Sequence, residues 1–428
     1  MLRKLYPNIY EGWIVVGSAG VIVLVVAATF FYGFGTIYNE VRGEFGWKNS
    51  ETALAFSLRN EVGGIGAILV GIALDRIGPK RVLFVGIIVT ASGVFAMSFM
   101  QQIWHFYVVM IVIALGSSAA AGQVGLTAVA TWFQVRRAFA MSIMTLGGGL
   151  GGLFVVGIAW IVEIAGWRDA LRLLALVMII VGFAVGSNVR SRPANHHQLL
   201  DGVKHDPEDG DPPVASAEQW GVPVMVAIRS RAFILLSVAL LGSSFGFVSL
   251  VVHQIPYFET QIGVSKSVAG GTIAVFTLLS IIGRVGFGWL ADRYSKRLMM
   301  AGAMASLSIG LVVLGLAPNF WVAVAGVAIA APGFGGTIPL RPSMTADYFG
   351  TKNFGTLNGT VQFISTTGGA AGPWIVGYIV DVNGSYTEGW LISAAVVALV
   401  GIPSILFATP PTSLMTRYRD AETPTTTC

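Results

Sequence analysis

The chain has 428 residues, of which 54% are hydrophobic and only 11% are charged, against roughly 25% charged residues in ordinary soluble domains. So few charges cannot cover the surface of a soluble protein of this length, and the composition indicates a multi-pass membrane protein. The net charge of +5 is no sign of nucleic-acid binding, because lysine and arginine in membrane proteins mark the cytoplasmic side. The single cysteine excludes a disulfide framework and a cysteine-ligated metal site.

Apolar stretches long enough to cross a bilayer, about 20 residues each, recur along the chain in two sets of six separated by a polar segment. They fall at roughly 11–38, 52–74, 80–101, 104–133, 137–162, 168–189, 230–257, 266–290, 297–317, 320–346, 353–380 and 387–408. The predicted fold is therefore an all-α membrane protein with twelve transmembrane helices in two pseudo-symmetric six-helix bundles.

The polar segment sets the expected domain organisation. The predicted parts are an N-terminal bundle at 1–189, a cytoplasmic linker at 190–228, a C-terminal bundle at 229–409 and a cytoplasmic tail at 410–428. The linker is rich in acidic, proline and small residues, which predicts a flexible segment. Its end, Trp220 to Ile228, is expected to form a short interfacial helix, and the tail after Thr409 is expected to be disordered. His196 and His197 are interpreted as loop residues and not as a metal site, because no second ligand cluster follows.

Positive charges are distributed unevenly between the two sides of the predicted spans. If both chain ends are placed on one side, that side collects eighteen lysines and arginines, and the other side holds Arg42, Lys48, Arg168 and Lys266. Such an excess marks the cytoplasmic side. We therefore expect a multi-pass protein of the plasma (inner) membrane with both termini in the cytoplasm.

Two similar charged turns end the second and eighth spans. They are GIALDRIGPKR, Gly71–Arg81, and RVGFGWLADRYSKR, Arg284–Arg297, and their aspartates Asp75 and Asp292 stand 217 residues apart. An offset of about half the chain indicates two copies of one unit. Only the second copy of this helix is expected to carry a buried arginine, Arg284.

Both turns resemble the signature of the major facilitator superfamily, G-x-L-x-D-R-x-G-R-R, with Ser295 in the second copy where glycine is usual. Within that superfamily the chain resembles the bacterial form of the monocarboxylate transporter and oxalate–formate antiporter branch. The segments that carry this resemblance are EGW at 11–13, EFGWKNSETALAFSL at 44–58, TWFQVRRAFAMS at 131–142, HQIPYFETQIGVS at 253–265 and DYFGTKNFGTLNG at 347–359. The resemblance implies alternating access, in which two bundles rock about a site near the bilayer midplane.

The resemblance also implies that charged residues at the cytoplasmic ends of the spans form a gate. The residues expected in this gate are Asp75, Arg76, Arg81, Asp292, Arg293, Arg297, Arg341 and Asp347. The first six belong to the repeated turns, and the last two lie near the cytoplasmic end of the tenth span.

Arg284 is the principal candidate for substrate binding. It lies eight residues before Asp292, which is about 12 Å along a helix and therefore inside the hydrocarbon layer. An arginine there costs roughly 2.5 to 3.5 kcal/mol on insertion scales, so it must face a cavity, a partner or an anion. Its planar fork suits a carboxylate, and the resemblance implies a substrate-binding arginine on this helix. An interhelical salt bridge, for example to Glu61, is the alternative. Ser280 stands where several relatives have an aspartate.

Five further polar residues complete the predicted site. Gln123, Tyr32 and Gln362 are expected either to contact the substrate or to form interhelical hydrogen bonds. Glu61 and His253 are candidates for proton coupling, because a desolvated carboxylate binds a proton near neutral pH and histidine titrates nearby. The alternatives are a structural role for Glu61 and helix capping for His253.

These observations predict a secondary active transporter of a small organic monocarboxylate, working by proton symport. The expected partners are the carboxylate anion, protons and the lipid bilayer, with no nucleic acid, cofactor or metal, and a monomer is expected to suffice. Anion exchange without proton coupling is the alternative. A membrane enzyme is not favoured, because the sequence contains no HExxH, GxSxG or Walker lysine and no intramembrane aspartate pair. A sensor would normally carry an added soluble domain.

Overall fold

A computed structural model describes residues 10–47, 49–120, 122–190, 200–202 and 220–420. Nearly all of these residues are helical, and within them the only β-pairing is one isolated bridge between Gly221 and Gly350. Nine helices of this described part are long and apolar enough to cross a membrane. The predicted all-α membrane architecture is confirmed.

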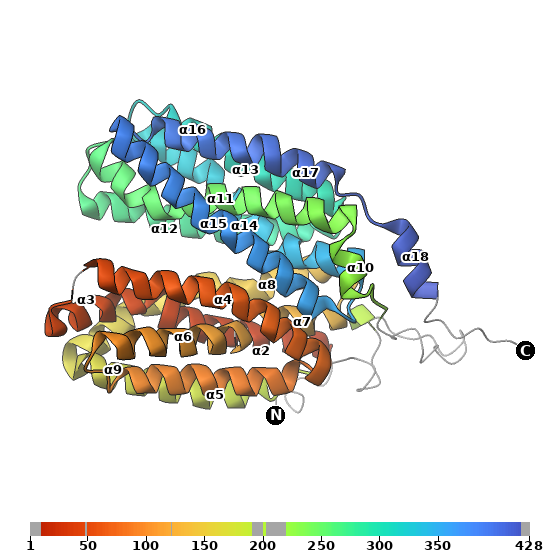
Figure 1. Cartoon of the computed structure of the whole chain (residues 1–428), viewed down its shortest axis with the longest axis horizontal. Helices are drawn as coiled ribbons and strands as arrows, with labels where there is room; N and C mark the ends of the chain where they lie inside the picture. The colour runs from red at the N-terminus through yellow and green to blue at the C-terminus, as the bar shows by residue number, and fades with distance from the viewer. Residues whose placement is uncertain (1–9, 48, 121, 191–199, 203–219, 421–428) are drawn as a thin grey trace, which may run out of the picture. The chain divides into compact units, whose positions relative to one another are not determined.

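The first half of the chain folds into helices that coincide with the six predicted spans (Figure 1). The elements are α2 (Glu11–Val26), the π-helix η1 (Ala27–Tyr32), α3 (Phe34–Phe45), α4 (Asn49–Ile77), α5 (Pro79–Met97), α6 (Ile103–Ala120), α7 (Gln123–Trp132), α8 (Arg137–Leu150), the 3-10 turn η2 (Gly151–Phe154) and α9 (Val155–Gly186). The first predicted span continues beyond its expected end, through η1 into α3.

The fifth and sixth predicted spans are joined through α9, which bends sharply at Gly166. Gly166 has φ 77° and ψ 161°, a conformation that glycine adopts far more readily than any other residue. The bend falls in the gap between the predicted spans 137–162 and 168–189, so the two expected crossings are present as two arms of one element.

The second half also follows its predicted spans. Its elements are α10 (Val224–Ile228), α11 (Arg231–Thr260), α12 (Lys266–Ala291), α13 (Lys296–Gly315), α14 (Phe320–Phe349), α15 (Phe354–Asn383), α16 (Thr387–Val396), the π-helix η7 (Val397–Gly401), α17 (Ile402–Phe407) and α18 (Thr412–Asp420). The short helix α10 lies within the stretch expected to form one.

The expectation of a disordered tail after Thr409 is wrong for α18. Pro410 and Pro411 precede this helix, and proline is favoured just at the start of a helix. Arg417 and Arg419 lie in its last turn, where a cation interacts favourably with the helix dipole. These local features favour a helix at 412–420.

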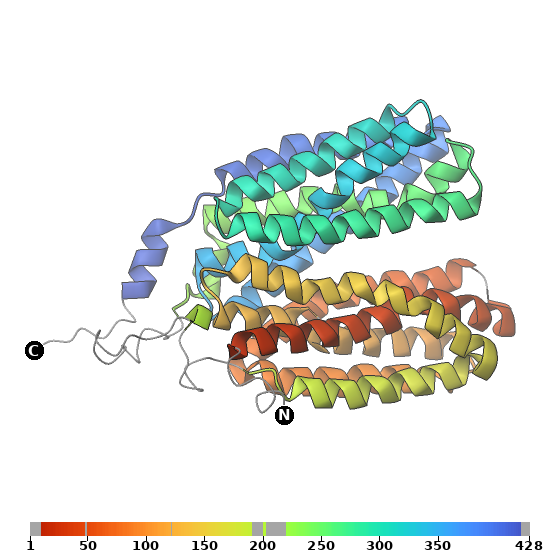
Figure 2. The same ribbon diagram turned by 180° about the vertical axis from the view of Figure 1, so that it is seen from behind.

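The chain divides into two compact units. Unit one comprises Met1–Gly221, Gly350–Thr360 and Arg417–Cys428, and unit two comprises Val222–Phe349 and Val361–Thr416. Each unit is a bundle of helices: α2 and α4–α9 in unit one, and α11–α14, α16 and α17 in unit two (Figures 1 and 2). The first residues of α15 group with unit one, although by sequence this helix belongs to the second repeat.

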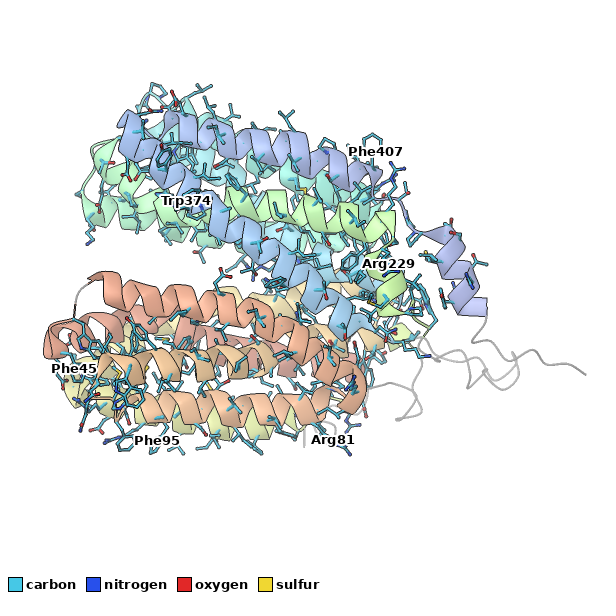
Figure 3. All side chains as sticks on the ribbon, viewed as in Figure 1. Phe45, Arg81, Phe95, Arg229, Trp374 and Phe407 are labelled. Carbon is cyan, nitrogen blue, oxygen red and sulfur yellow. The ribbon has the colours of Figure 1, made fainter. Side chains whose placement is uncertain are left out.

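The two ends of unit one differ in chemistry. At one end Phe45 stacks on Trp47, with ring centroids 4.6 Å apart, and at the other end Arg81 is exposed. Figure 3 shows Phe45 and Phe95 near the first end and Arg81 near the opposite end. Aromatic rings and basic side chains are both typical of membrane–water interfaces, with the basic side chains concentrated on the cytoplasmic side.

One residue of the expected linker is fixed to unit one. Asp201 lies in the short 3-10 turn Leu200–Gly202 and is the one described non-glycine residue with positive φ, 56°. Its carboxylate accepts backbone hydrogen bonds from Gln134, Val135 and Arg136 at 2.9–3.0 Å. This part of the linker is therefore held against the turn between α7 and α8. His196 and His197 lie outside the described residues.

Candidate functional site

Arg284 lies in α12 of unit two and is 7% exposed. Helix α14 approaches it closely, because a Cβ placed on Gly335 would lie 2.0 Å from the backbone oxygen of Ser280 and 2.9 Å from the backbone nitrogen of Arg284. Small residues allow such close helix crossings in membranes. The backbone that carries Arg284 is therefore held firmly between neighbours.

Three phenylalanines from three helices stack near this crossing. The Phe334 ring of α14 lies 4.4 Å from the Phe247 ring of α11 and 5.4 Å from the Phe276 ring of α12, centroid to centroid, with interplanar angles of 24° and 20°. Phe276 precedes Arg284 by about two helical turns. Unit two thus combines a buried guanidinium with an aromatic surface, an arrangement suited to an acid with an apolar body.

Arg341, a predicted gate residue, lies in α14 beyond these rings. The expected neighbour Asp347 is instead paired with Lys296, whose Nζ lies 2.5 Å from Asp347 Oδ2. Within the described residues, Arg341 Nε is buried and has no hydrogen-bond partner. The ion pair at this end of α14 is therefore Lys296–Asp347.

Asp75, at the end of α4, holds the start of α15. Its carboxylate accepts hydrogen bonds from the backbone nitrogens of Gly355 and Thr356, both at 2.8 Å, and from Thr356 Oγ1 at 2.6 Å. A carboxylate at a helix N-terminus satisfies free backbone donors and interacts favourably with the helix dipole. Arg76 and Arg81 beside it are exposed.

The second charged turn is built differently. Asp292 is the C-terminal cap of α12 and is half-buried, as is Arg297. Arg293 is exposed, and its guanidinium carbon lies 3.6 Å from the centroid of the Trp289 ring. The two signature turns therefore hold their charged residues in different environments.

The polar residues predicted to contact substrate have partners inside their own units. Asn358 Nδ2 donates to Gln123 Oε1 at 2.8 Å, and Gln123 is 7% exposed. Gln362 Nε2 lies 3.4 Å from Thr366 Oγ1, one turn away. Substrate contact by Gln123 and Gln362 stays a prediction. The side chain of Tyr32, in η1, lies outside the described residues.

The two proton-coupling candidates occupy different environments. Glu61 is exposed in α4, so the desolvation expected for it is not seen. His253 of α11 is half-buried, and its Nε2 lies 2.9 Å from the backbone oxygen of Pro373 in α15, so the histidine nitrogen donates. This hydrogen bond fixes the ring against α15.

Arg59 is a buried arginine that the sequence analysis did not identify. It lies in α4, is 8% exposed, and its guanidinium carbon is 4.7 Å from the centroid of the Phe30 ring. The expectation that only the second repeat carries a buried arginine on this helix is therefore wrong. The physical reason is that an aromatic face can accept a cation in place of an anion, and no spacing rule reveals that pairing between two helices.

Two helical units related by a sequence repeat define a class of multi-pass membrane proteins. The family model of the Major Facilitator Superfamily matches residues 20–284 and 254–425. The chain belongs to this superfamily of transporters. It is therefore not an enzyme, as predicted, and the predicted fold type is confirmed.

Similar proteins with curated names are transporters too. The chain is 25% identical to monocarboxylate transporter 13 of Bos taurus, over 96% of this chain and 95% of the relative. It is 23% identical to monocarboxylate transporter 12 of Rattus norvegicus, over 89% and 82%, and 22% identical to the MFS-type transporter YcxA of Bacillus subtilis, over 81% and 82%. Among solved structures, the E. coli fucose:proton symporter FucP matches with a TM-score of 0.69 at 14% identity, over 93% of this chain and 98% of FucP, which shows the shared fold.

Proposed function

We propose that the chain is a secondary active transporter of a small organic monocarboxylate, and that Arg284 binds the carboxylate. The observation that carries this proposal is the burial of Arg284, 7% exposed, at the α12–α14 crossing. Ionisable residues inside membranes are costly and are retained chiefly at functional sites. A guanidinium binds a carboxylate through two parallel hydrogen bonds. The names of the relatives, monocarboxylate transporters 12 and 13, support the same substrate class.

Proton symport is the proposed mode of coupling, with alternating access between the two sides of the plasma (inner) membrane. Glu61 or His253 would carry the proton, Gln123, Tyr32 and Gln362 would assist binding, and a monomer would be the working unit. The charged turns, with Asp75 as the capping residue of α15, would gate the cytoplasmic side, where both termini would lie. The hydrogen bond of His253 to α15 supports a role for this histidine, because protonation would add a second donor on the ring.

Anion exchange without proton coupling is the second candidate. Two observations favour it. Ser280, which is 3% exposed, stands one turn before Arg284 where an acidic residue would couple a proton directly. Glu61 is exposed and is therefore not enclosed by the protein around it, as the proposed role in proton coupling would require.

The test is uptake of labelled monocarboxylates into proteoliposomes, with wild type, Arg284→Ala and the control Arg229→Ala. Arg229 is an exposed arginine of the same unit that lies between α10 and α11, so the control removes the same charge outside the proposed site and gate. We expect gradient-driven accumulation with wild type and Arg229→Ala, and none with Arg284→Ala. Exchange of substrate at a rate that does not depend on the proton gradient would favour the second candidate, anion exchange without proton coupling. Full activity of Arg284→Ala would make this arginine structural and overturn the site.

A further inference from the structure

An open groove runs along the surface of unit one between α5 and α9. Its volume is about 550 Å³, and the residues that line it are apolar except for Ser92 and Arg172. Small side chains leave room for the groove, because the buried residues Ala91 of α5 and Ala175 of α9 form its base. Both helices belong to apolar spans, so the groove opens toward the hydrocarbon of the bilayer and is suited to an apolar chain.

The groove is closed at one end and carries a cation at the other. At the closed end the two helices touch, because a Cβ placed on Gly182 of α9 would lie 2.8 Å from Cγ2 of Ile87 in α5. From there the lining of α9 runs from Ile179 back to Arg172. These seven residues span about 10 Å of helix, and one leaflet of a bilayer contributes about 15 Å of hydrocarbon. The groove is therefore long enough for the upper part of one acyl chain.

Arg172 lies where α5 ends. Its Nε donates a hydrogen bond at 3.3 Å to Oγ of Ser98, the C-terminal cap of α5, and its guanidinium carbon lies 5.0 Å from the centroid of the Phe99 ring. The exposed Arg81 is near the other end of α5, and Figure 3 shows Phe95, which lines the groove, at the end of unit one opposite Arg81. Arginine side chains near the end of a span extend their charged heads to the level of the lipid head groups.

Two opposite charges lie side by side at this end of the groove. Nη1 of Arg172 is 2.7 Å from Oδ1 of Asp169, and the two side chains are 41% and 61% exposed. The described part of the chain offers no acceptor to Arg172 Nη2 and no donor to Asp169 Oδ2. An exposed ion pair of this kind contributes little by itself. The pair therefore presents a cationic donor and an anionic acceptor to the head-group region, as a zwitterionic head group requires.

We propose that this groove binds a zwitterionic phospholipid whose head group carries a primary ammonium, as in phosphatidylethanolamine. The phosphate binds Arg172, the ammonium binds Asp169, and one acyl chain lies between α5 and α9. Phosphatidylglycerol has no ammonium and would place a net negative charge beside Asp169. Phosphatidylcholine has a quaternary ammonium, which has no N–H to donate. The site therefore distinguishes lipids by their head groups, and it uses none of the residues proposed to bind the transported substrate.

Head-group selectivity is tested by native mass spectrometry of the purified, delipidated full chain. The probes are phosphatidylethanolamine, phosphatidylcholine and phosphatidylglycerol with identical acyl chains. With wild type we expect the first phosphatidylethanolamine to bind about tenfold more tightly than either other lipid. Arg172→Gln abolishes this preference and Arg172→Lys retains part of it. Asp169→Asn lets phosphatidylglycerol bind as well as phosphatidylethanolamine, because the repelling carboxylate is gone. The control Arg168→Gln keeps the preference, because Arg168 pairs with Glu44 and does not line the groove.

The position of the acyl chain is tested with phosphatidylethanolamine that carries a photoreactive group on one chain. We expect crosslinks to peptides of α5 and α9. Ser92→Trp places a large ring in the groove from an exposed position and should reduce these crosslinks. The control Val156→Trp adds the same ring to an exposed position in the other arm of α9 and should leave them unchanged. Soluble glycerophosphoethanolamine, which lacks acyl chains, should not displace the lipid.

Several outcomes would overturn the proposal. Equal binding of the three lipids by wild type, or a preference that survives Arg172→Gln, would refute the head-group site. Crosslinks that persist in Ser92→Trp, or displacement of the lipid by glycerophosphoethanolamine, would show that the acyl chain does not occupy the groove. If Ser92→Trp changed the oligomeric state and left lipid binding intact, a second copy of the chain would be the occupant of the groove.

Discussion

Helices α4 and α12 occupy the same place in the two repeats, yet they bury their arginines at different levels. At the 217-residue offset of Asp75 and Asp292, Arg59 corresponds to Phe276, and Phe30 corresponds to Phe247. In unit one the Arg59 guanidinium lies 4.7 Å from the Phe30 ring centroid, whereas in unit two Phe276 and Phe247 both stack on Phe334.

The difference shows that a repeat can conserve a packing position while changing its polarity. A guanidinium is planar and stacks on aromatic faces, so it can take the place of a ring. In unit one the arginine occupies the aromatic position. In unit two that position stays aromatic, and the arginine lies two turns further along α12, at Arg284. The guanidinium of Arg59 thus packs against an aromatic ring, whereas Arg284 is the residue that we propose binds the substrate carboxylate.

Among the variants considered, exchanging arginine and phenylalanine between the equivalent positions 59 and 276 should have the largest effect on stability. Phe276→Arg introduces a cation into a position that is 6% exposed and surrounded by rings, and we expect a loss of about 3–5 kcal/mol of stability, the scale of an uncompensated buried charge. Arg59→Phe replaces the cation with a ring against Phe30 and should cost far less. Thermal unfolding of both purified variants checks this. If Arg59→Phe destabilised the protein as much as Phe276→Arg, Arg59 would not simply take the place of a ring.

Neutralising the two signature aspartates should have an intermediate effect. Asp75→Asn keeps one side-chain oxygen as an acceptor at the start of α15 and replaces the other with a donor, so we expect a loss of about 1–3 kcal/mol, the scale of leaving a buried donor without its acceptor. Asp292 caps the C-terminus of α12, where a negative charge is unfavourable for the helix dipole, so Asp292→Asn should cost less. Denaturation of the two variants in parallel measures the difference. A larger loss of stability from Asp292→Asn than from Asp75→Asn would contradict this prediction.

The smallest effect on stability is expected from lowering the pH. Glu44 accepts hydrogen bonds from Arg168 and Trp167, which lower its pKa below the usual value, whereas the second repeat has neutral Gln261 at the equivalent position. A lowered folded-state pKa adds stability above the unfolded pKa, and this stability is lost as pH falls through the folded pKa. For such an exposed pair the change is under about 1 kcal/mol.

Unfolding of wild type and Glu44→Gln at neutral pH and below about pH 4 measures this contribution. We expect Glu44→Gln to be slightly less stable than wild type at neutral pH and equal to it in acid. The control Gln261→Asn should change the free energy of unfolding by the same amount at neutral pH and in acid. An unchanged difference between wild type and Glu44→Gln across pH would show that Glu44 does not titrate in this range.

Much of the fold could be predicted from the sequence, because a membrane span is a local property of about 20 apolar residues. The repeat and its signature turns could also be recognised in the sequence. Contacts between segments that are distant in the sequence could not be predicted. Asp75 accepts hydrogen bonds from Gly355 and Thr356, about 280 residues away in the sequence. Asp347 pairs with Lys296 and not with Arg341, which is nearer in the sequence, because a separation of six residues in a helix places the Asp347 and Arg341 side chains on different faces. Glu61 was expected to be buried by depth alone, but its exposure depends on which face of α4 packs inward.

The anchoring of Asp201 has a consequence for producing the protein in two pieces. Exposed loops are where a cut in the chain is best tolerated. A cut after Gly202 would leave the first fragment with its end fastened by three hydrogen bonds to the turn between α7 and α8. A cut before Leu200 would remove that fastening from the first fragment. Division after Gly202 therefore keeps the turn between α7 and α8 fastened within the first fragment, whereas division before Leu200 turns the same three hydrogen bonds into a contact that can join the two fragments.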